Sequence, residues 1–201
     1  TNPKDEFPSL YEQKGEKIAT LSAAAIQKEF SSVVFSSSTD TTRPALSGVL
    51  MRKEPEGFLL VTTDGLRLSL KHYLNKEKTS PDELSLLIPA RVFKELLSMK
   101  DESEEITMFI SEGSNQILFE QKETILVGRL IDAAFPPFEK IIPSDFSVRV
   151  TFDREEMQKA VKICSIFAKD AANIIKFSFK KDHIIVSSSS AQVGENTVTI
   201  D

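Results

Sequence analysis

Apolar residues recur at helical spacing in three stretches of the chain, 22–36, 89–100 and 153–170. This period predicts three helices, each with one face against a core. Ser22 and Asp153 suit the N-cap positions of the first and third helices, and Pro89 fits the first turn of the second. The apolar faces are Ala23, Ile26, Phe30, Val33 and Val34; Val92, Phe93, Leu96 and Leu97; and Met157, Val161, Cys164, Phe167 and Ala168.

Short apolar runs and runs that alternate apolar with polar residues predict strands between and after the helices. Asp64-Gly65 is a turn signal that divides one long run into a hairpin, with alternating leucines from Leu66 on. The segment 135–143 contains two adjacent prolines, which favours a connector over a helix or a central strand. The predicted strands are 45–52, 57–71 in two parts, 84–88, 106–110, 117–120, 125–131, 148–152, 174–179, 183–187 and 197–200.

The order strand, helix, strand, strand, strand occurs three times, starting near Lys17, Leu84 and Val148. The first and third copies share three identities, each 131 residues apart: Thr20/Thr151, Gln27/Gln158 and Lys28/Lys159. Two copies would pair their sheets and lay two helices on one side, which makes the fold class α+β. We therefore expect a linker at 1–16, a complete domain at 17–142 and half of a second domain at 143–201.

The composition is that of an ordinary globular chain and excludes several classes of protein. The 201 residues carry a net charge of −5 and are 40% hydrophobic, which excludes disorder as the main state. A single cysteine, Cys164, excludes an internal disulfide framework and a cysteine zinc cluster. No apolar run reaches the ~18 residues of a membrane helix. The first residues are polar, so we expect no signal peptide there, and the missing initiator Met indicates a piece of a longer protein. The expected compartment is the cytoplasm.

Catalytic chemistry has little support in the sequence. The nucleophile-elbow, H-E-x-x-H zinc and phosphate-loop motifs are all absent. His72 and His183 are isolated, and Cys164 lies on an apolar helix face, where a thiol is buried and inert. The acidic runs 101–105 and 155–156 fit a solvated loop and a helix first turn better than a metal site. We therefore predict no catalytic residue, no metal and no cofactor.

The charges are distributed unevenly along the chain. The three helical stretches carry about 0, +2 and 0, so the rest of the chain carries about −7. The basic residues of the second and third helices that lie off the apolar faces are Arg91, Lys94, Lys100, Lys159, Lys162 and Lys169. Such a surface can contact phosphates without reading bases. A basic face that serves only solubility is the alternative.

A second candidate surface is apolar. Leu46, Leu66 and Leu68 lie near predicted turns, together with Thr63, Gly65 and Arg67. Core packing explains some of these leucines, and a peptide-binding groove is the other interpretation, since apolar side chains near loop ends often line one.

Three segments carry a family resemblance: R-P-A-L-S-G-V-L at 43–50, L-V-T-T-D-G-L-R-L at 60–68 and F-P-P-F-E-K-I-I-P at 135–143. In this order and spacing they resemble the bacterial sliding-clamp family, the beta subunits of the replicative DNA polymerase III. The resemblance covers essentially the whole chain. It implies the middle domain of that family at about 17–140 and the first half of its third domain from about residue 146.

What the resemblance implies is a DNA-clamp fold and a processivity function without an active site. Members form a head-to-tail homodimeric ring whose helices line the hole, and the ring encircles duplex DNA without sequence specificity. The replicative polymerase, the clamp loader and other partners dock short motifs in an apolar pocket. By motif match, the pocket residues are Leu46, Thr63, Gly65, Leu66, Arg67, Leu68, Pro136, Lys140 and Ile141. The DNA-facing residues would be Lys28, Arg91, Lys94, Lys100, Lys159, Lys162 and Lys169.

Two features depart from the family. Members often have His or Tyr where Leu66 stands, so we expect a more apolar pocket rim, and the C-terminal strand that completes the pocket is missing from this sequence. Two other functions stay open on the sequence alone: a protein-interaction module without DNA binding, and a small α+β enzyme with an unrecognised site.

Overall fold

The structure, a computed structural model, describes residues 14–40, 42–75, 84–99, 104–111, 113, 115–170 and 172–201. The chain divides into two compact units, unit 1 (Thr1–Phe138) and unit 2 (Glu139–Asp201), which are described separately here. The predictions for 1–13, 76–83 and 100–103 lie outside the described residues. They include most of the linker 1–16 and most of the acidic run 101–105.

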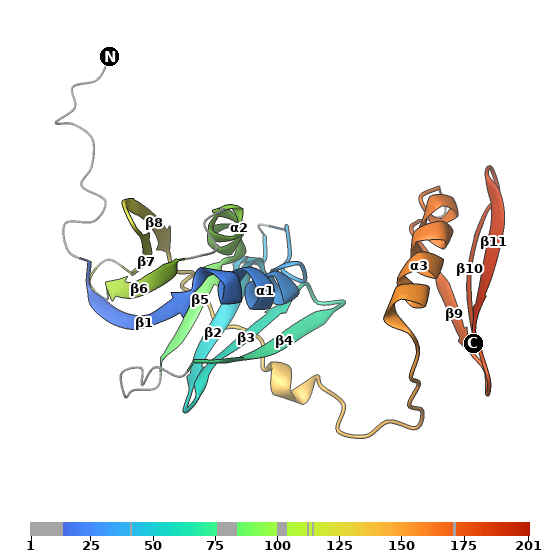
Figure 1. The fold of residues 1–201 in the computed structure, drawn as a ribbon, viewed down its shortest axis with the longest axis horizontal. Coiled ribbons are helices and arrows are strands. Elements are labelled where there is room, and N and C mark those ends of the chain that lie inside the picture. Colours follow the sequence, from blue (N-terminus) through green and yellow to red (C-terminus); the bar gives the residue numbers. More distant parts are fainter. Residues whose placement is uncertain are drawn as a thin grey trace, which may run out of the picture. The chain divides into compact units, whose positions relative to one another are not determined.

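Unit 1 consists of two halves with the same order of elements (Figure 1). The first half comprises β1 (Glu16–Ser22), α1 (Ala23–Val34), the 3-10 helix η2 (Pro44–Ser47), β2 (Gly48–Glu54), β3 (Gly57–Thr63) and β4 (Leu68–Leu74). The second half comprises β5 (Ser85–Pro89), α2 (Ala90–Ser98), β6 (Glu105–Ser111), β7 (Gln116–Gln121) and β8 (Thr124–Arg129). The first two predicted copies of the repeat and the α+β class are thereby confirmed.

Each half of unit 1 supplies its first strand to the sheet of the other half. β1 pairs antiparallel with β6, in a sheet of order β1-β6-β7-β8. β5 pairs antiparallel with β2, in a sheet of order β4-β3-β2-β5. This exchange joins the two halves through backbone hydrogen bonds as well as through side chains.

The main core lies between the helices and the two sheets, and both halves contribute to it. The ring of Phe93 stacks on Phe30 of α1 at 5.0 Å between centroids and meets Phe119 of β7 edge-on at 6.0 Å. Burying each of these rings stabilises the folded state by about 1.5–3 kcal/mol. Gln27 of α1 donates from Nε2 to the carbonyls of Leu97 and Met99, at 2.7 and 3.1 Å, and so satisfies acceptors at the end of α2.

Two predicted element bounds in unit 1 are wrong. The strand expected at 45–52 begins only at Gly48, because Pro44, which has a fixed φ and no N–H, opens the 3-10 helix η2. Leu66 was expected to begin the alternation of the following strand, whereas it belongs to the turn, and β4 begins at Leu68. The turn itself is where the Asp64-Gly65 signal predicts it.

In its described part, unit 2 contains the α-helix α3, one sheet and the end of the 3-10 helix η4 (Phe138–Lys140) (Figure 1). α3 (Arg154–Ala168) packs on β10 (Ile184–Ser190) and β11 (Gly194–Ile200), and β9 (Lys176–Phe179) completes the order β11-β10-β9. The predicted face of α3 is correct for Cys164 and Ala168, and Ala160 is the third buried position. Met157, Val161 and Phe167 were expected to be buried and are only partly so.

The strand predicted at 148–152 is wrong. These residues follow the expected alternation, yet they form no strand and all are exposed. A strand needs a hydrogen-bonded neighbour, and the equivalent strand of unit 1, β1, finds its neighbour in the other half of its unit. Unit 2 supplies only one such half among the described residues.

Candidate partner-binding surface and basic helix faces

The turn between β3 and β4 is built around the carboxylate of Asp64. Its Oδ1 accepts hydrogen bonds from the backbone N–H groups of Leu66 and Arg67, at 2.9 and 3.0 Å. Its Oδ2 accepts from Nε of Arg67 at 2.9 Å. The hydroxyl of Thr63 donates to the carbonyl of Arg67 at 2.7 Å and accepts from the N–H of Gly65 at 3.1 Å. The turn therefore has a defined shape.

These contacts have an electrostatic and a conformational consequence. The backbone N–H groups of Arg67 and Leu66, in that order, lower the pKa of Asp64 below its ordinary value of 3.8 because they stabilise the carboxylate. Gly65 has a φ of +94°, a left-handed conformation that glycine adopts at little cost. Arg67 extends to the carbonyl of Phe35 at 2.9 Å and lies over the Phe35 ring. The turn is thus tied to the segment that follows α1.

The outer face of the sheet β4-β3-β2-β5 carries a second apolar cluster, on the side away from the helices. Its buried members are Leu50, Leu59, Val61, Leu87 and Phe138, and partly buried Ala45, Leu68, Leu70, Ile131 and Phe135 pack against them. We call this set the outer-face cluster. It brings segment 60–68 together with segment 135–138, although more than 60 residues separate them in the sequence.

Phe135 and Phe138 are functional candidates that were not among the predicted pocket residues. Their rings meet edge-on at 6.3 Å, and the guanidinium of Arg52 lies 5.5 Å from the Phe138 centroid. The signal that could have identified them is the pair of phenylalanines flanking two prolines. Prolines hold the backbone extended, so both rings can reach one sheet face.

The other predicted pocket residues lie in different environments. Leu46 is buried in η2, and its carbonyl accepts from the N–H of Ser38 at 2.8 Å. Leu66 is 99% exposed at the tip of the turn and takes no part in the outer-face cluster. Pro136 is half-buried between the two phenylalanines. Lys140 and Ile141 belong to unit 2, where both are exposed.

The basic residues predicted to face DNA are exposed on the helices wherever the structure describes them. This holds for Lys28 on α1, for Arg91 and Lys94 on α2, and for Lys159, Lys162 and Lys169 on and after α3. Lys100 lies outside the described residues. Arg91 lies 3.9 Å from Glu95, and Lys28 lies 4.0 Å from Glu29, so neighbouring carboxylates offset part of the positive charge.

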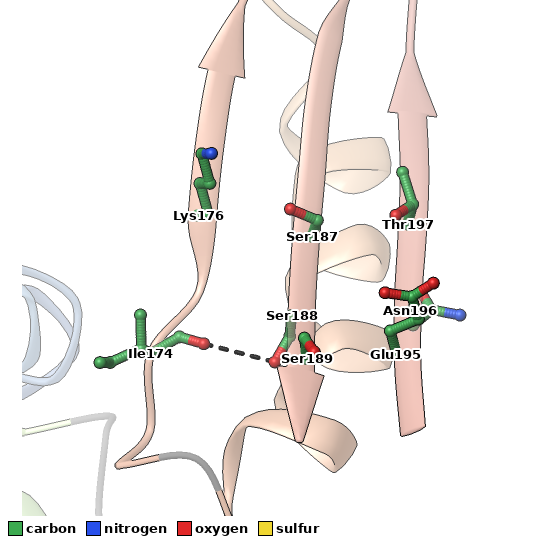
Figure 2. A pocket seen from close by; sticks show the side chains of 8 residues that line it. All are labelled: Ile174, Lys176, Ser187, Ser188, Ser189, Glu195, Asn196 and Thr197. Atoms are coloured by element: carbon green, nitrogen blue, oxygen red, sulfur yellow. Dashed lines mark hydrogen bonds between the residues drawn. The ribbon is translucent and has the colours of Figure 1, made fainter. Parts of the chain in front are cut away.

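Unit 2 has a hollow of about 370 Å³ on its sheet, drawn in Figure 2. Its lining is rich in hydroxyl groups and comprises Ile174, Lys176, Ser187, Ser188, Ser189, Glu195, Asn196 and Thr197. The hydroxyl of Ser188 donates to the carbonyl of Ile174 at 3.3 Å (Figure 2). None of the predicted site residues lines this hollow.

The residues considered for catalysis or metal binding have structural surroundings. Nδ1 of His72 lies 2.8 Å from the carboxylate of Glu54, on the surface. Cys164 is buried under α3, and burial raises the pKa of its thiol. In the described part of the chain no three His, Cys, Asp or Glu side chains gather as a metal site would need. Among the described helices none combines the length and apolarity that crossing a membrane requires.

Comparison with solved structures supports the fold. A DNA polymerase sliding clamp from Bacillus subtilis is 28% identical with a TM-score of 0.87, and the match covers 98% of this chain and 52% of that one. The beta chain of DNA polymerase III from Streptococcus pneumoniae is 24% identical with a TM-score of 0.88, over 100% of this chain and 53% of that one. The repeated strand–helix–strand–strand–strand order is therefore the DNA-clamp fold.

Comparison with curated relatives and family models identifies the same family. A beta sliding clamp from Staphylococcus aureus is 27% identical over 199 residues, and one from Synechococcus elongatus is 27% identical over 182 residues. These matches cover 98% and 89% of this chain but only 52% and 48% of the relatives, so the chain spans about half their length. The model of the central domain of the DNA polymerase III beta subunit matches residues 20–137, and that of its C-terminal domain matches 139–201. The chain belongs to the DNA polymerase III beta subunit family, the sliding clamps.

Proposed function

We propose that this chain is the part of a DNA sliding clamp that docks partner proteins and contributes basic helices to the wall around duplex DNA. One observation carries the proposal: the sheet β4-β3-β2-β5 of unit 1 has helices with exposed basic residues on one side and an apolar cluster on the other. The helices and their lysines lie on one side, and the outer-face cluster with the Asp64 turn lies on the other. Such a protein can hold a partner without obstructing the surface that meets DNA.

The docking surface in this proposal is the turn 63–68 beside the outer-face cluster. Leu66 supplies an exposed apolar side chain on a turn held by Asp64 and Arg67. A preorganised turn loses little entropy when a peptide binds, and a large apolar side chain gains by leaving water. The replicative polymerase and the clamp loader, which dock short apolar motifs in the family, are the proposed partners.

Substitution of Leu66 tests the docking surface with little risk to the fold. We expect Leu66→Asp to weaken the binding of a fluorescent clamp-motif peptide, taken from a bacterial replicative polymerase, by about tenfold, since one apolar contact is worth about 1–2 kcal/mol. Leu74→Asp is the matched control, because Leu74 is also an exposed leucine (71%) and lies at the far end of β4. Equal affinities for the two variants in a polarisation titration would remove this surface from the proposal.

The helix faces would contact the phosphate backbone rather than the bases. Lys94 and Lys162 project into solvent from α2 and α3, and no aromatic side chains alternate with the basic residues along these faces. Without stacking partners or base-reading side chains, binding should be weak, unselective and strongly dependent on salt. A topological ring needs only this kind of contact.

Charge reversal tests the helix faces. The double variant Lys94→Glu and Lys162→Glu should bind a duplex more weakly than the unchanged chain and reduce the slope of log affinity against log salt by about 2. Lys180→Glu with Lys181→Glu is the matched control, because these exposed lysines follow β9 in a turn and belong to no helix. A control that loses as much affinity as the helix variant would show that only net charge matters.

The remaining elements of the proposal follow from the family. The chain would act without catalysing a reaction, as part of a homodimeric ring in the cytoplasm, where a free thiol such as that of Cys164 stays reduced. Residues 17–142 would form the complete middle domain and 143–201 half of the third. The compact units divide after Phe138 and the two family matches meet at 137 and 139, which favours the same two domains with a boundary about four residues earlier.

A further inference from the structure

The solvent-facing sides of α1 and α2 form one surface, because the two helices pack against each other. The rings of Phe30 and Phe93 stack between them, 5.0 Å apart at their centroids, and Gln27 of α1 donates to the carbonyl of Leu97 near the end of α2. Charges on either helix can therefore act on the same ligand. The exposed basic residues of this surface are Lys28 on α1 and Arg91 and Lys94 on α2.

Two carboxylates, those of Glu29 and Glu95, lie among these basic residues, and α1 and α2 contain no other acidic residue. Glu29 is bound to the sheet beneath its helix. Its Oε2 lies 2.7 Å from Nζ of Lys71 on β4, and its side chain is only 20% exposed. This ion pair neutralises Glu29 within the folded chain, so Glu29 has little charge left to act on a ligand.

The surroundings of Glu95 are different. Its side chain is 57% exposed, and the cation beside it is Arg91, one turn away on the same helix, at 3.9 Å between Oε1 and Nε. An ion pair this long and this exposed is weak, so the carboxylate remains a negative charge toward solvent. Lys94 is its neighbour in the chain. A phosphate that contacts Arg91 or Lys94 therefore also meets the charge of Glu95.

Glu95 is a large part of a small total charge. The three basic and two acidic residues of this surface leave a net charge of +1 on α1 and α2, and a neutral residue at position 95 would double it. Residues one turn apart on a helix are about 5–6 Å apart at Cβ, which is less than the Debye length of about 8 Å at physiological salt. Salt ions therefore screen Glu95 only partly from a phosphate held by Arg91.

We propose that Glu95 limits the affinity of the α1–α2 surface for duplex DNA. Its carboxylate repels the phosphates that Arg91 and Lys94 attract, so contacts with the DNA backbone stay weak and are quickly exchanged. This inference rests on the proposed function and adds to it a residue that opposes binding. A protein that moves along a duplex has to release one phosphate as readily as it takes the next, whereas basic residues alone favour holding it.

Removal of the charge at position 95 tests the inference. Glu95→Gln keeps the size of the side chain, and the variant should keep its fold because Glu95 is exposed and belongs to no core cluster. We expect it to bind a short duplex about three- to tenfold more tightly at about 50 mM salt. It should also steepen the slope of log affinity against log salt by about 1, since about one more phosphate contact forms. Glu95→Asp keeps the charge and should bind like the unchanged chain.

Glu123→Gln is the matched control. Glu123 is exposed in the turn between β7 and β8 and belongs to no helix, and its substitution changes the net charge of the chain by the same amount. This variant should leave both the affinity for duplex and the salt slope unchanged.

Three outcomes would overturn the inference. They are a Glu95→Gln chain that binds duplex no more tightly than the unchanged chain, a Glu123→Gln chain that gains as much affinity, and a Glu95→Asp chain that gains as much as Glu95→Gln. The double variant Lys94→Glu and Lys162→Glu separates this inference from the proposed function. If it loses affinity while Glu95→Gln changes nothing, only the role of Glu95 is wrong. If neither changes the affinity, the proposed function fails as well.

Discussion

Among the described residues, unit 1 contains the order strand, helix, strand, strand, strand twice, whereas unit 2 contains its helix and last three strands once and lacks the first strand. In unit 1 the exchanged strands β1 and β5 are paired, and their apolar residues are buried in a core shared by both halves. In unit 2 the equivalent segment is unpaired, and its apolar residues are exposed. The comparison teaches that, among the described residues, the first strand of a half is formed and buried where the other half of its unit is present to pair with it.

The largest expected difference lies in the two cores. Phe93→Ala, in the fully buried ring cluster of unit 1, should lower the free energy of unfolding of that unit by about 3–5 kcal/mol. Phe179→Ala, on the half-exposed edge of unit 2, should cost less than about 1 kcal/mol.

Urea denaturation separates the two effects. The chain has no tryptophan, and Tyr73 is buried in the core of unit 1, so the fluorescence of Tyr73 follows that unit while far-ultraviolet circular dichroism follows both. Similar losses from the two substitutions would mean that β9 is already part of a closed core.

The N-caps of α1 and α3 also differ between the two units, with a smaller expected effect on stability. Asp153 caps α3 by accepting from the N–H groups of Glu155 and Glu156, at 2.8 and 2.9 Å, whereas the Ser22 side chain makes no capping bond on α1. Asp153→Ala should therefore lower the free energy of unfolding of unit 2 by about 1 kcal/mol, and Ser22→Ala should lower that of unit 1 much less.

Amide hydrogen exchange would locate this effect. In Asp153→Ala the first-turn amides of α3 should exchange faster, and Asp153→Asn should restore their protection because an amide oxygen also accepts. If Ser22→Ala loosened α1 as much as Asp153→Ala loosens α3, the capping explanation would be wrong.

A local pH effect distinguishes the turns of the two units. The folded pKa of Asp64 is lowered, so its charged form stabilises the β3–β4 turn fully above the ordinary value of 3.8. That stabilisation is lost only as the pH falls through the lowered pKa. The β9–β10 turn is closed by a backbone bond of 2.9 Å from the N–H of Lys180 to the carbonyl of His183.

Nuclear magnetic resonance titration between neutral and acid pH would follow the Leu66 amide. Its shift should change below pH 3.8, and Asp64→Asn should remove that change. A transition above 3.8 would contradict the lowered pKa, since hydrogen bonds to the carboxylate move its titration downward.

The sequence by itself determined the local structure and the repeat. Helical spacing of apolar residues located α1, α2 and α3 to within a few residues, because each helix needs only one buried face. Asp64-Gly65 located a turn, because its conformation and its carboxylate bonds are made within a few residues. The same local signals revealed the two copies of one supersecondary unit in unit 1 and, for the third copy, the helix and the three strands that follow it.

Tertiary structure alone decided which strands are paired and which side chains meet. The alternation of Val148, Val150 and Phe152 is as regular as that of β6, yet only β6 has partners, and hydrogen bonds between strands depend on residues distant in the chain. The placing of Phe135 and Phe138 on the outer face of β3 likewise depends on a connector that packs across a sheet. Local patterns specify what a segment can form, and the availability of a distant neighbour decides whether it does.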